Sequence, residues 1–197
     1  MLIYFDSSHL LICLLALAIA LIVLWNQKKS PSYLFFLSAF WLYLIGVVSV
    51  VVFPIYIPDG NLYPHVSLQM NLVPFDFGAC DPTILCVKNI YENILLTIPF
   101  GFGISFISKI KPRNTYWLAL AVGLMLEITQ LVISLIVHSA FRVVDINDVL
   151  LNAIGVLIGY GLFRIFGKIY SAATHKLQIR YQHIFAYIYD VIHKPDH

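Results

Sequence analysis

The stretch FRVVDINDVLLNAIGVLIGYG, residues 141–161, places an arginine, two aspartates and an asparagine ahead of an apolar segment punctuated by glycines. At about 100° per helical residue, one face roughly 80° wide would carry Asp145, Asp148, Asn152, Gly155 and Gly159. The remaining positions are mostly valine, leucine and isoleucine. Gly155 and Gly159 have the small-xxx-small spacing that lets a neighbouring helix approach closely. The stretch therefore predicts a membrane-spanning helix whose polar face is turned toward protein rather than lipid.

The composition places the whole chain among integral membrane proteins. Of its 197 residues, 60% are hydrophobic and 11% are charged, and the mean hydropathy is +0.87. A net charge of +2, with scattered lysines and arginines, argues against a nucleic-acid-binding surface. The partners favoured by this composition are lipids, membrane-borne molecules and other membrane proteins.

Five apolar stretches are long enough to cross a bilayer, which needs about 20 helical residues. They cover residues 8–25, 33–57, 90–108, 115–137 and 145–167. The first stretch resembles a signal peptide, but no positive charge precedes it and Lys28 and Lys29 follow it, so we expect an uncleaved anchor. The expected fold is all-α, a polytopic bundle of transmembrane helices in a single domain over residues 1–197.

Lysine and arginine are concentrated in alternate connections between the spans. The loops NQKKSPS and KIKPRN and the tail after the fifth span are positively charged, so the positive-inside rule places them in the cytoplasm. The N-terminus and the segment 58–88, which has three aspartates and one lysine, then face outward. Cys80 and Cys86 lie in this segment, where a disulfide and two reduced thiols are both compatible with the sequence.

The tail carries apolar residues at alternating steps of four and three. They are Leu177, Tyr181, Ile184, Ile188 and Val191. This pattern predicts an amphipathic helix over residues 175–192, lying on the cytoplasmic interface. A sixth helix packed against the bundle explains the same pattern.

The fourth span repeats the polar-face pattern of the fifth. Its polar and small residues on one face are Gly123, Glu127, Gln130, Ser134 and His138. If this helix reaches the outer surface near residue 137, Glu127 lies about 15 Å deep, near the middle of a ~30 Å core. A carboxylate there costs about 2.5–3.5 kcal/mol on insertion scales unless it is paired, protonated or hydrated. Such residues usually mark a functional site.

Further polar residues are expected at the same outward level. Asn93 lies on an outer turn of the third span, and Arg142 is the cation nearest in sequence to the acids. Two interpretations fit the segment MNLVPFDF, residues 70–77: Asn71, Pro74 and Phe75 form a turn or a short re-entrant piece beside the cluster, or the segment rests on the lipid headgroups. The sequence thus predicts one polar site in the outward half of the bundle.

Simpler explanations apply to some of these residues. Asn93, Gln130 and Asn152, taken singly, are also explained as hydrogen-bonding residues between helices. The sequence has no Walker A loop, H-E-x-x-H motif or G-x-S-x-G motif, which argues against ATP use, zinc proteolysis and serine hydrolysis. Asp145 and Asp148 are candidate ligands for Mg²⁺ or Ca²⁺ together with a substrate phosphate, on residue type and spacing alone.

Four separated motifs resemble the VanZ-like family of bacterial membrane proteins. They are NLVPF (71–75), ENILLTIPFGFG (92–103), LEITQ (126–130) and RVVDINDVLLNAIGVLIG (142–159). The resemblance covers about residues 40–165, in the family's order and spacing. It implies a multi-pass protein of the bacterial plasma membrane linked to resistance against teicoplanin and related lipoglycopeptides. The family's characteristic polar positions correspond here to Asn71, Asn93, Glu127, Gln130, Arg142, Asp145, Asp148 and Asn152.

Two functions fit these residues. In the first, an enzyme modifies a lipid-linked cell-envelope precursor at the outer leaflet. Arg142 would bind a phosphate, Asp145 and Asp148 would bind metal or act as base, and Glu127 would act as acid or support the other groups. In the second, a binding or transport protein holds a lipid headgroup or an acyl-tailed antibiotic in the same cleft without chemistry. A third hypothesis is that the protein is a scaffold for wall-synthesis proteins.

Overall fold

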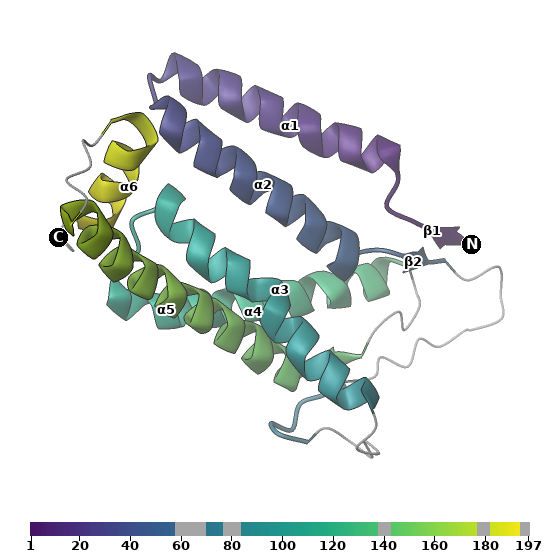
Figure 1. The fold of residues 1–197 in the computed structure, drawn as a ribbon. Coiled ribbons are helices and arrows are strands. Elements are labelled where there is room, and N and C mark those ends of the chain that lie inside the picture. Colours follow the sequence, from purple (N-terminus) through teal and green to yellow (C-terminus); the bar gives the residue numbers. More distant parts are fainter. Residues whose placement is uncertain (58–69, 77–83, 138–142, 177–181, 194–197) are drawn as a thin grey trace.

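A computed structural model describes residues 1–57, 70–76, 84–137, 143–176 and 182–193. For residues 84–86 it describes the backbone alone. Within these ranges, five helices are long and apolar enough to cross a membrane, which confirms the expected bundle (Figure 1). The helices are α1 (Ser7–Asn26), α2 (Pro31–Val51), α3 (Ile84–Ile107), α4 (Pro112–Ile136) and α5 (Ile146–Lys176), followed by the shorter α6 (His183–His193).

Local sequence explains where several helices begin and end. The side chain of Asp6 accepts hydrogen bonds from the backbone N–H groups of Ser8 and His9 and so caps α1. The side chain of Ser30 caps α2, which has proline at its first position. That helix ends at Val51 rather than at residue 57, because Pro54 disfavours the helical conformation in the residue before it. Conversely, α5 continues to Lys176 rather than ending at residue 167, since no proline interrupts it.

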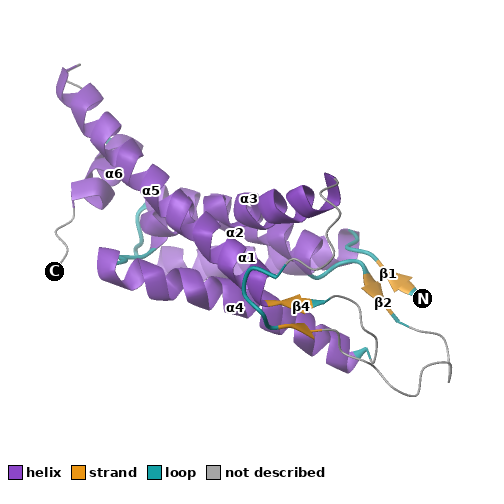
Figure 2. Cartoon of the chain, turned by 90° about the horizontal axis from the view of Figure 1, so that it is seen from below, coloured by secondary structure: helices purple, strands orange, loops and turns teal. Residues whose placement is uncertain are grey.

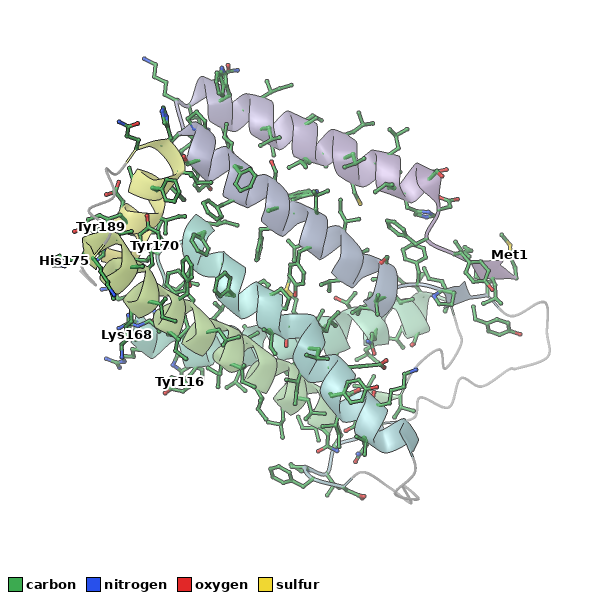
Figure 3. All side chains as sticks on the ribbon, in the orientation of Figure 1. Met1, Tyr116, Lys168, Tyr170, His175 and Tyr189 are labelled. Carbon is green, nitrogen blue, oxygen red and sulfur yellow. The ribbon has the colours of Figure 1, made fainter. Side chains whose placement is uncertain are left out.

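The helices pack in the order α1, α2, α3, α5, α4. In α5, 44% of the most apolar stretch is buried, against 6% in α1, so α5 forms the centre and α1 the periphery. α3 and α5 run in the same direction, because Thr97 contacts Asn152 while Gly101, further along α3, faces Val156. We call the end at which α3 and α5 begin the site end, and the opposite end the α6 end. Figure 3 shows Lys168 of α5 and Tyr189 of α6 at the α6 end, far from Met1.

Glycines allow α3 and α5 to touch along their backbones. A Cβ atom added to Gly159 would lie 2.0 Å from the carbonyl oxygen of Ile98, and one added to Gly155 would lie 2.3 Å from that of Ile94. Gly101 on α3 is equally close to α5, with the carbonyl oxygen of Val156 only 2.0 Å from its would-be Cβ. These contacts confirm the close helix approach that the spacing of Gly155 and Gly159 predicts.

We expect the substitution Gly159→Ala to destabilise the protein by about 1–3 kcal/mol, because the added methyl group must push α3 and α5 apart. Gly161→Ala is the matched control, since a Cβ atom there meets nothing within 4 Å. Thermal unfolding in detergent measures both. Equal melting temperatures for the two variants would contradict the close packing.

Within the described part of the chain, two short strand pairs accompany the helices (Figure 2). β1 (Leu2–Ile3) pairs antiparallel with β2 (Ile55–Tyr56), beyond the end of α2. β3 (Met70–Asn71) pairs in parallel with β4 (Val144–Asp145), which sets Asn71 opposite Asp145. The second pair joins the 70–76 segment to the beginning of α5.

The amphipathic helix expected over residues 175–192 is confirmed as α6, over a shorter range. Residue 176 still belongs to α5, and residues 177–181 lie outside the described part of the chain. α6 packs against α2 and α3, as the alternative of a sixth bundle helix requires. The hydroxyl of Tyr187 donates to the carbonyl oxygen of Phe106, and its ring stacks on Phe36 at 5.5 Å. Burial raises the pKa of Tyr187 to about 12, so this hydroxyl remains protonated at neutral pH.

Candidate functional site

The predicted polar residues gather near the beginning of α5, against α3, α4 and the 70–76 segment. The backbone N–H of Asp145 donates to Oε2 of Glu127 at 3.1 Å, so α5 begins level with Glu127 of α4. Glu127 is only 4% exposed. It lies about 14 Å from the end of α4 at Ile136 and about 22 Å from its beginning at Pro112, at ~1.5 Å per residue. Glu127 therefore lies within the length of the α4 span, closer to the end at which α3 and α5 begin than to the α6 end.

Asp145 joins the 70–76 segment to α5. Nδ2 of Asn71 donates to both carboxylate oxygens of Asp145, at 3.1 and 3.2 Å, and to the backbone oxygen of Asp76 at 2.6 Å. Oδ1 of Asp145 also accepts the backbone N–H of Asn147 at 2.8 Å, as the residue capping a helix does. Helical periodicity predicts Asp145 on the face of α5. The structure instead places it in β4, just before the helix, because its side chain caps the first turn.

Asn147 holds the turn of the 70–76 segment against α5. Its Oδ1 accepts the backbone N–H of Phe75 at 2.6 Å, and its Nδ2 donates to the backbone oxygen of Asp76 at 2.8 Å. Phe75 has a φ of 64°, a left-handed conformation that is uncommon for a bulky residue. Asn147 is only 2% exposed. The turn expected around Pro74 is thus present beside the cluster, and a buried asparagine secures it.

Asp148 faces α3. Its Oδ1 accepts from Nδ2 of Asn93 at 2.8 Å and from Nδ2 of Asn89 at 3.1 Å. Nδ2 of Asn152 donates to Oδ1 of Asn93 at 3.3 Å and to the backbone oxygen of Asp148 at 2.8 Å. The hydroxyl of Thr97 donates to the backbone oxygen of Asn152 at 2.8 Å. Oδ1 of Asn152 is buried and has no hydrogen-bond partner among the described residues.

The sequence of the chain matches a known protein family. The sequence model of the VanZ/LLP1 family matches residues 40–167, which is more than half of the chain. The chain belongs to the VanZ/LLP1 family. The matched range contains the site residues of α3, α4, α5 and the 70–76 segment, and it excludes α1 and α6. No curated protein and no solved structure matched the chain significantly.

Six of the eight predicted site residues of this VanZ/LLP1 protein form two hydrogen-bonded groups. The first contains Asn71, Asp145 and Glu127, and the second contains Asn93, Asp148 and Asn152. The groups are contiguous, because Asp145 and Asp148 lie on either side of Asn147. Gln130 is buried on the same α4 face as Glu127. Arg142 and His138 lie outside the described residues, as does Cys80; the side chain of Cys86 is likewise not described.

Sequence reasoning missed Asn147 as a site residue of this VanZ/LLP1 protein. Periodicity excluded it, because Asn147 lies about 100° around the helix from Asp148. A different signal was available. A turn packed against a membrane helix must satisfy its backbone N–H and C=O groups, and an asparagine side chain offers both a donor and an acceptor.

The described residues offer little support for a metal centre. Asp145 and Asp148, the candidate Mg²⁺ or Ca²⁺ ligands, each accept N–H donors from asparagine side chains. Within the described ranges, no three His, Cys, Asp or Glu side chains converge as a metal site requires.

Proposed function

We propose that this VanZ/LLP1 protein works in the bacterial plasma membrane, where its polar site faces outward and acts on a lipid-linked cell-envelope molecule. Through this action it protects the cell against teicoplanin-type lipoglycopeptides. The observation that carries the proposal is the partly buried polar network in which Asp145 and Asp148 each receive asparagine amides from another segment. The link to these antibiotics rests on the family resemblance.

A purely structural role accounts poorly for this network. Well-packed apolar side chains of similar volume often stabilise a protein as well as a buried polar pair does. Furthermore, the network contains an acceptor that it does not use. Oδ1 of Asn152 is buried without a hydrogen-bond partner in the described part of the chain. Unused buried acceptors are expensive within a membrane, and they favour a ligand that donates hydrogen bonds.

The arrangement suggests a division of roles for an enzyme. Two amide donors fix the orientation of the Asp148 carboxylate, so we assign Asp148 as the general base, the group that would accept a proton from a hydroxyl of the substrate. Asn89 and Asn93 are positioning residues in this assignment. Glu127 supports the site through the backbone of Asp145, and Arg142 binds the substrate phosphate.

A second candidate function is binding without chemistry. It is favoured by the fact that the carboxylates of Asp145 and Asp148 already accept hydrogen bonds within the protein. Such a site presents a rigid polar surface to a lipid headgroup or to an acyl-tailed antibiotic. Teicoplanin carries a lipid tail and vancomycin does not, which gives a membrane-embedded site a physical basis for distinguishing them.

Mass spectrometry of lipid-linked wall precursors incubated with the purified full-length protein tests both versions. Catalysis predicts a time-dependent change in precursor mass that the Asp148→Asn variant does not produce. Binding predicts an unchanged mass together with saturable retention of the precursor, which Asp148→Asn weakens. If neither conversion nor retention occurs over a range of pH and divalent metal concentrations, the proposed function is wrong.

A further inference from the structure

A cavity lies at the α6 end of the bundle, opposite to the candidate functional site. It has a volume of about 640 Å³ and is enclosed by the beginning of α2, the end of α3 with the following loop, the middle of α5, and α6. We call it the α6 cavity. Figure 1 shows α6 folded back beside the beginning of α2 and the end of α3.

Basic side chains dominate the charge of the α6 cavity. The cationic residues that line it are Lys29, Lys109, Lys111 and Arg164. They come from three separate parts of the chain, the α1–α2 loop, the α3–α4 loop and α5. His193 of α6 also lines the cavity, and no aspartate or glutamate is among its described lining residues. Four converging cations without a carboxylate favour an anionic ligand, and phosphate is an anion that lysine and arginine both bind.

The remaining wall of the α6 cavity is largely apolar. Phe106, Ile107, Phe163 and Ile192 line this part. The hydroxyl of Ser105, which also lines the cavity, is buried and makes no hydrogen bond with any described residue. A cavity with cations on one side and apolar side chains on the other fits an amphiphile with an anionic head.

We propose that the α6 cavity binds an anionic phospholipid, with the phosphate against Lys109, Lys111 and Arg164 and an acyl chain along Phe106 and Phe163. The positive-inside rule predicts that this end faces the cytoplasm, where basic segments meet anionic headgroups. Because α6 closes one side of the cavity, the bound lipid would stabilise the packing of α6 against the beginning of α2 and the end of α3. This site is independent of the proposed function at the opposite end.

Native mass spectrometry of the full-length protein, released from nanodiscs of phosphatidylglycerol and phosphatidylcholine, tests the proposal. We expect phosphatidylglycerol to be retained preferentially by the wild type. The double variant Lys109→Gln with Arg164→Gln should weaken that retention roughly tenfold or more. Both replaced side chains are exposed, so the fold should persist, and an unchanged melting temperature in detergent checks this.

The matched control is the double variant Lys168→Gln with Lys176→Gln. It removes the same charge from exposed positions of α5 that do not line the cavity. Equal loss of lipid in both double variants would overturn the proposal, and so would equal retention of the two lipids by the wild type. Displacement of the lipid by millimolar inorganic phosphate would identify a site for free phosphate and would also overturn it.

Discussion

Replacing Asp148 with asparagine is expected to reduce protection against teicoplanin to the level of cells that lack the protein, while the protein still folds. Asparagine has the same shape and keeps one side-chain oxygen that can accept the N–H groups of Asn89 and Asn93. What it removes is the negative charge. A hydrogen bond to a charged group contributes about 1.5–3 kcal/mol, which corresponds to roughly a 10- to 100-fold loss of binding or activity.

The inhibitory concentration of teicoplanin, measured beside the amount of protein in the membrane, reports this effect. Glu92→Gln is the matched control because it also neutralises a carboxylate, next to Asn93 in sequence. The Glu92 side chain is 56% exposed and forms an ion pair with Lys88 at 3.6 Å, outside the polar network. If cells with the Asp148→Asn variant were protected normally against teicoplanin, the negative charge of Asp148 would not be needed for function.

The Asn147→Leu substitution is expected to have the second-largest effect. Leucine is close in size to asparagine but loses both hydrogen bonds to the turn, leaving the N–H of Phe75 and the carbonyl oxygen of Asp76 without these partners. The carbonyl oxygen of Asp76 keeps the hydrogen bond from Nδ2 of Asn71, whereas the N–H of Phe75 is left unsatisfied, which costs about 1–3 kcal/mol. The 70–76 segment should separate from α5, and protection should fall with it.

Hydrogen exchange at the Phe75 amide, together with the melting temperature, measures this separation. Asn114→Leu serves as a control, because it makes the same replacement at an exposed position in the first turn of α4. If Asn147→Leu left both exchange and melting unchanged, the side chain would not be holding the turn.

Most of the fold follows from short-range patterns that the sequence displays directly. Apolar length predicts the five spans, and the spacing of Gly155 and Gly159 predicts the close contact with α3. Proline explains one error in a span boundary, since Pro54 ends α2 early. These features depend on neighbours in the chain, and the membrane permits few alternatives to a helix.

The candidate site is less predictable, because it depends on contacts between distant segments. Periodicity brings Asp148 and Asn152 to one face of α5, but it cannot show that Asn93 meets them from α3. It also extends α5 too far, since Asp145 caps the helix and pairs with Asn71 across 74 residues. Parallel pairing at this separation leaves no periodic signal in either strand.

The proposed function requires a polar site that is open to the outside of the cell, and labelling with a membrane-impermeant maleimide tests this directly. In a background where Cys13, Cys80 and Cys86 are replaced by serine, Val73→Cys reports the site end and Lys109→Cys reports the α6 end. Val73 is 59% exposed in the 70–76 segment, and Lys109 is exposed in the α3–α4 loop. In intact protoplasts the account predicts labelling of Val73→Cys, with Lys109→Cys labelled only after permeabilisation. Labelling of Lys109→Cys alone in intact protoplasts would place the site on the cytoplasmic side and contradict the account.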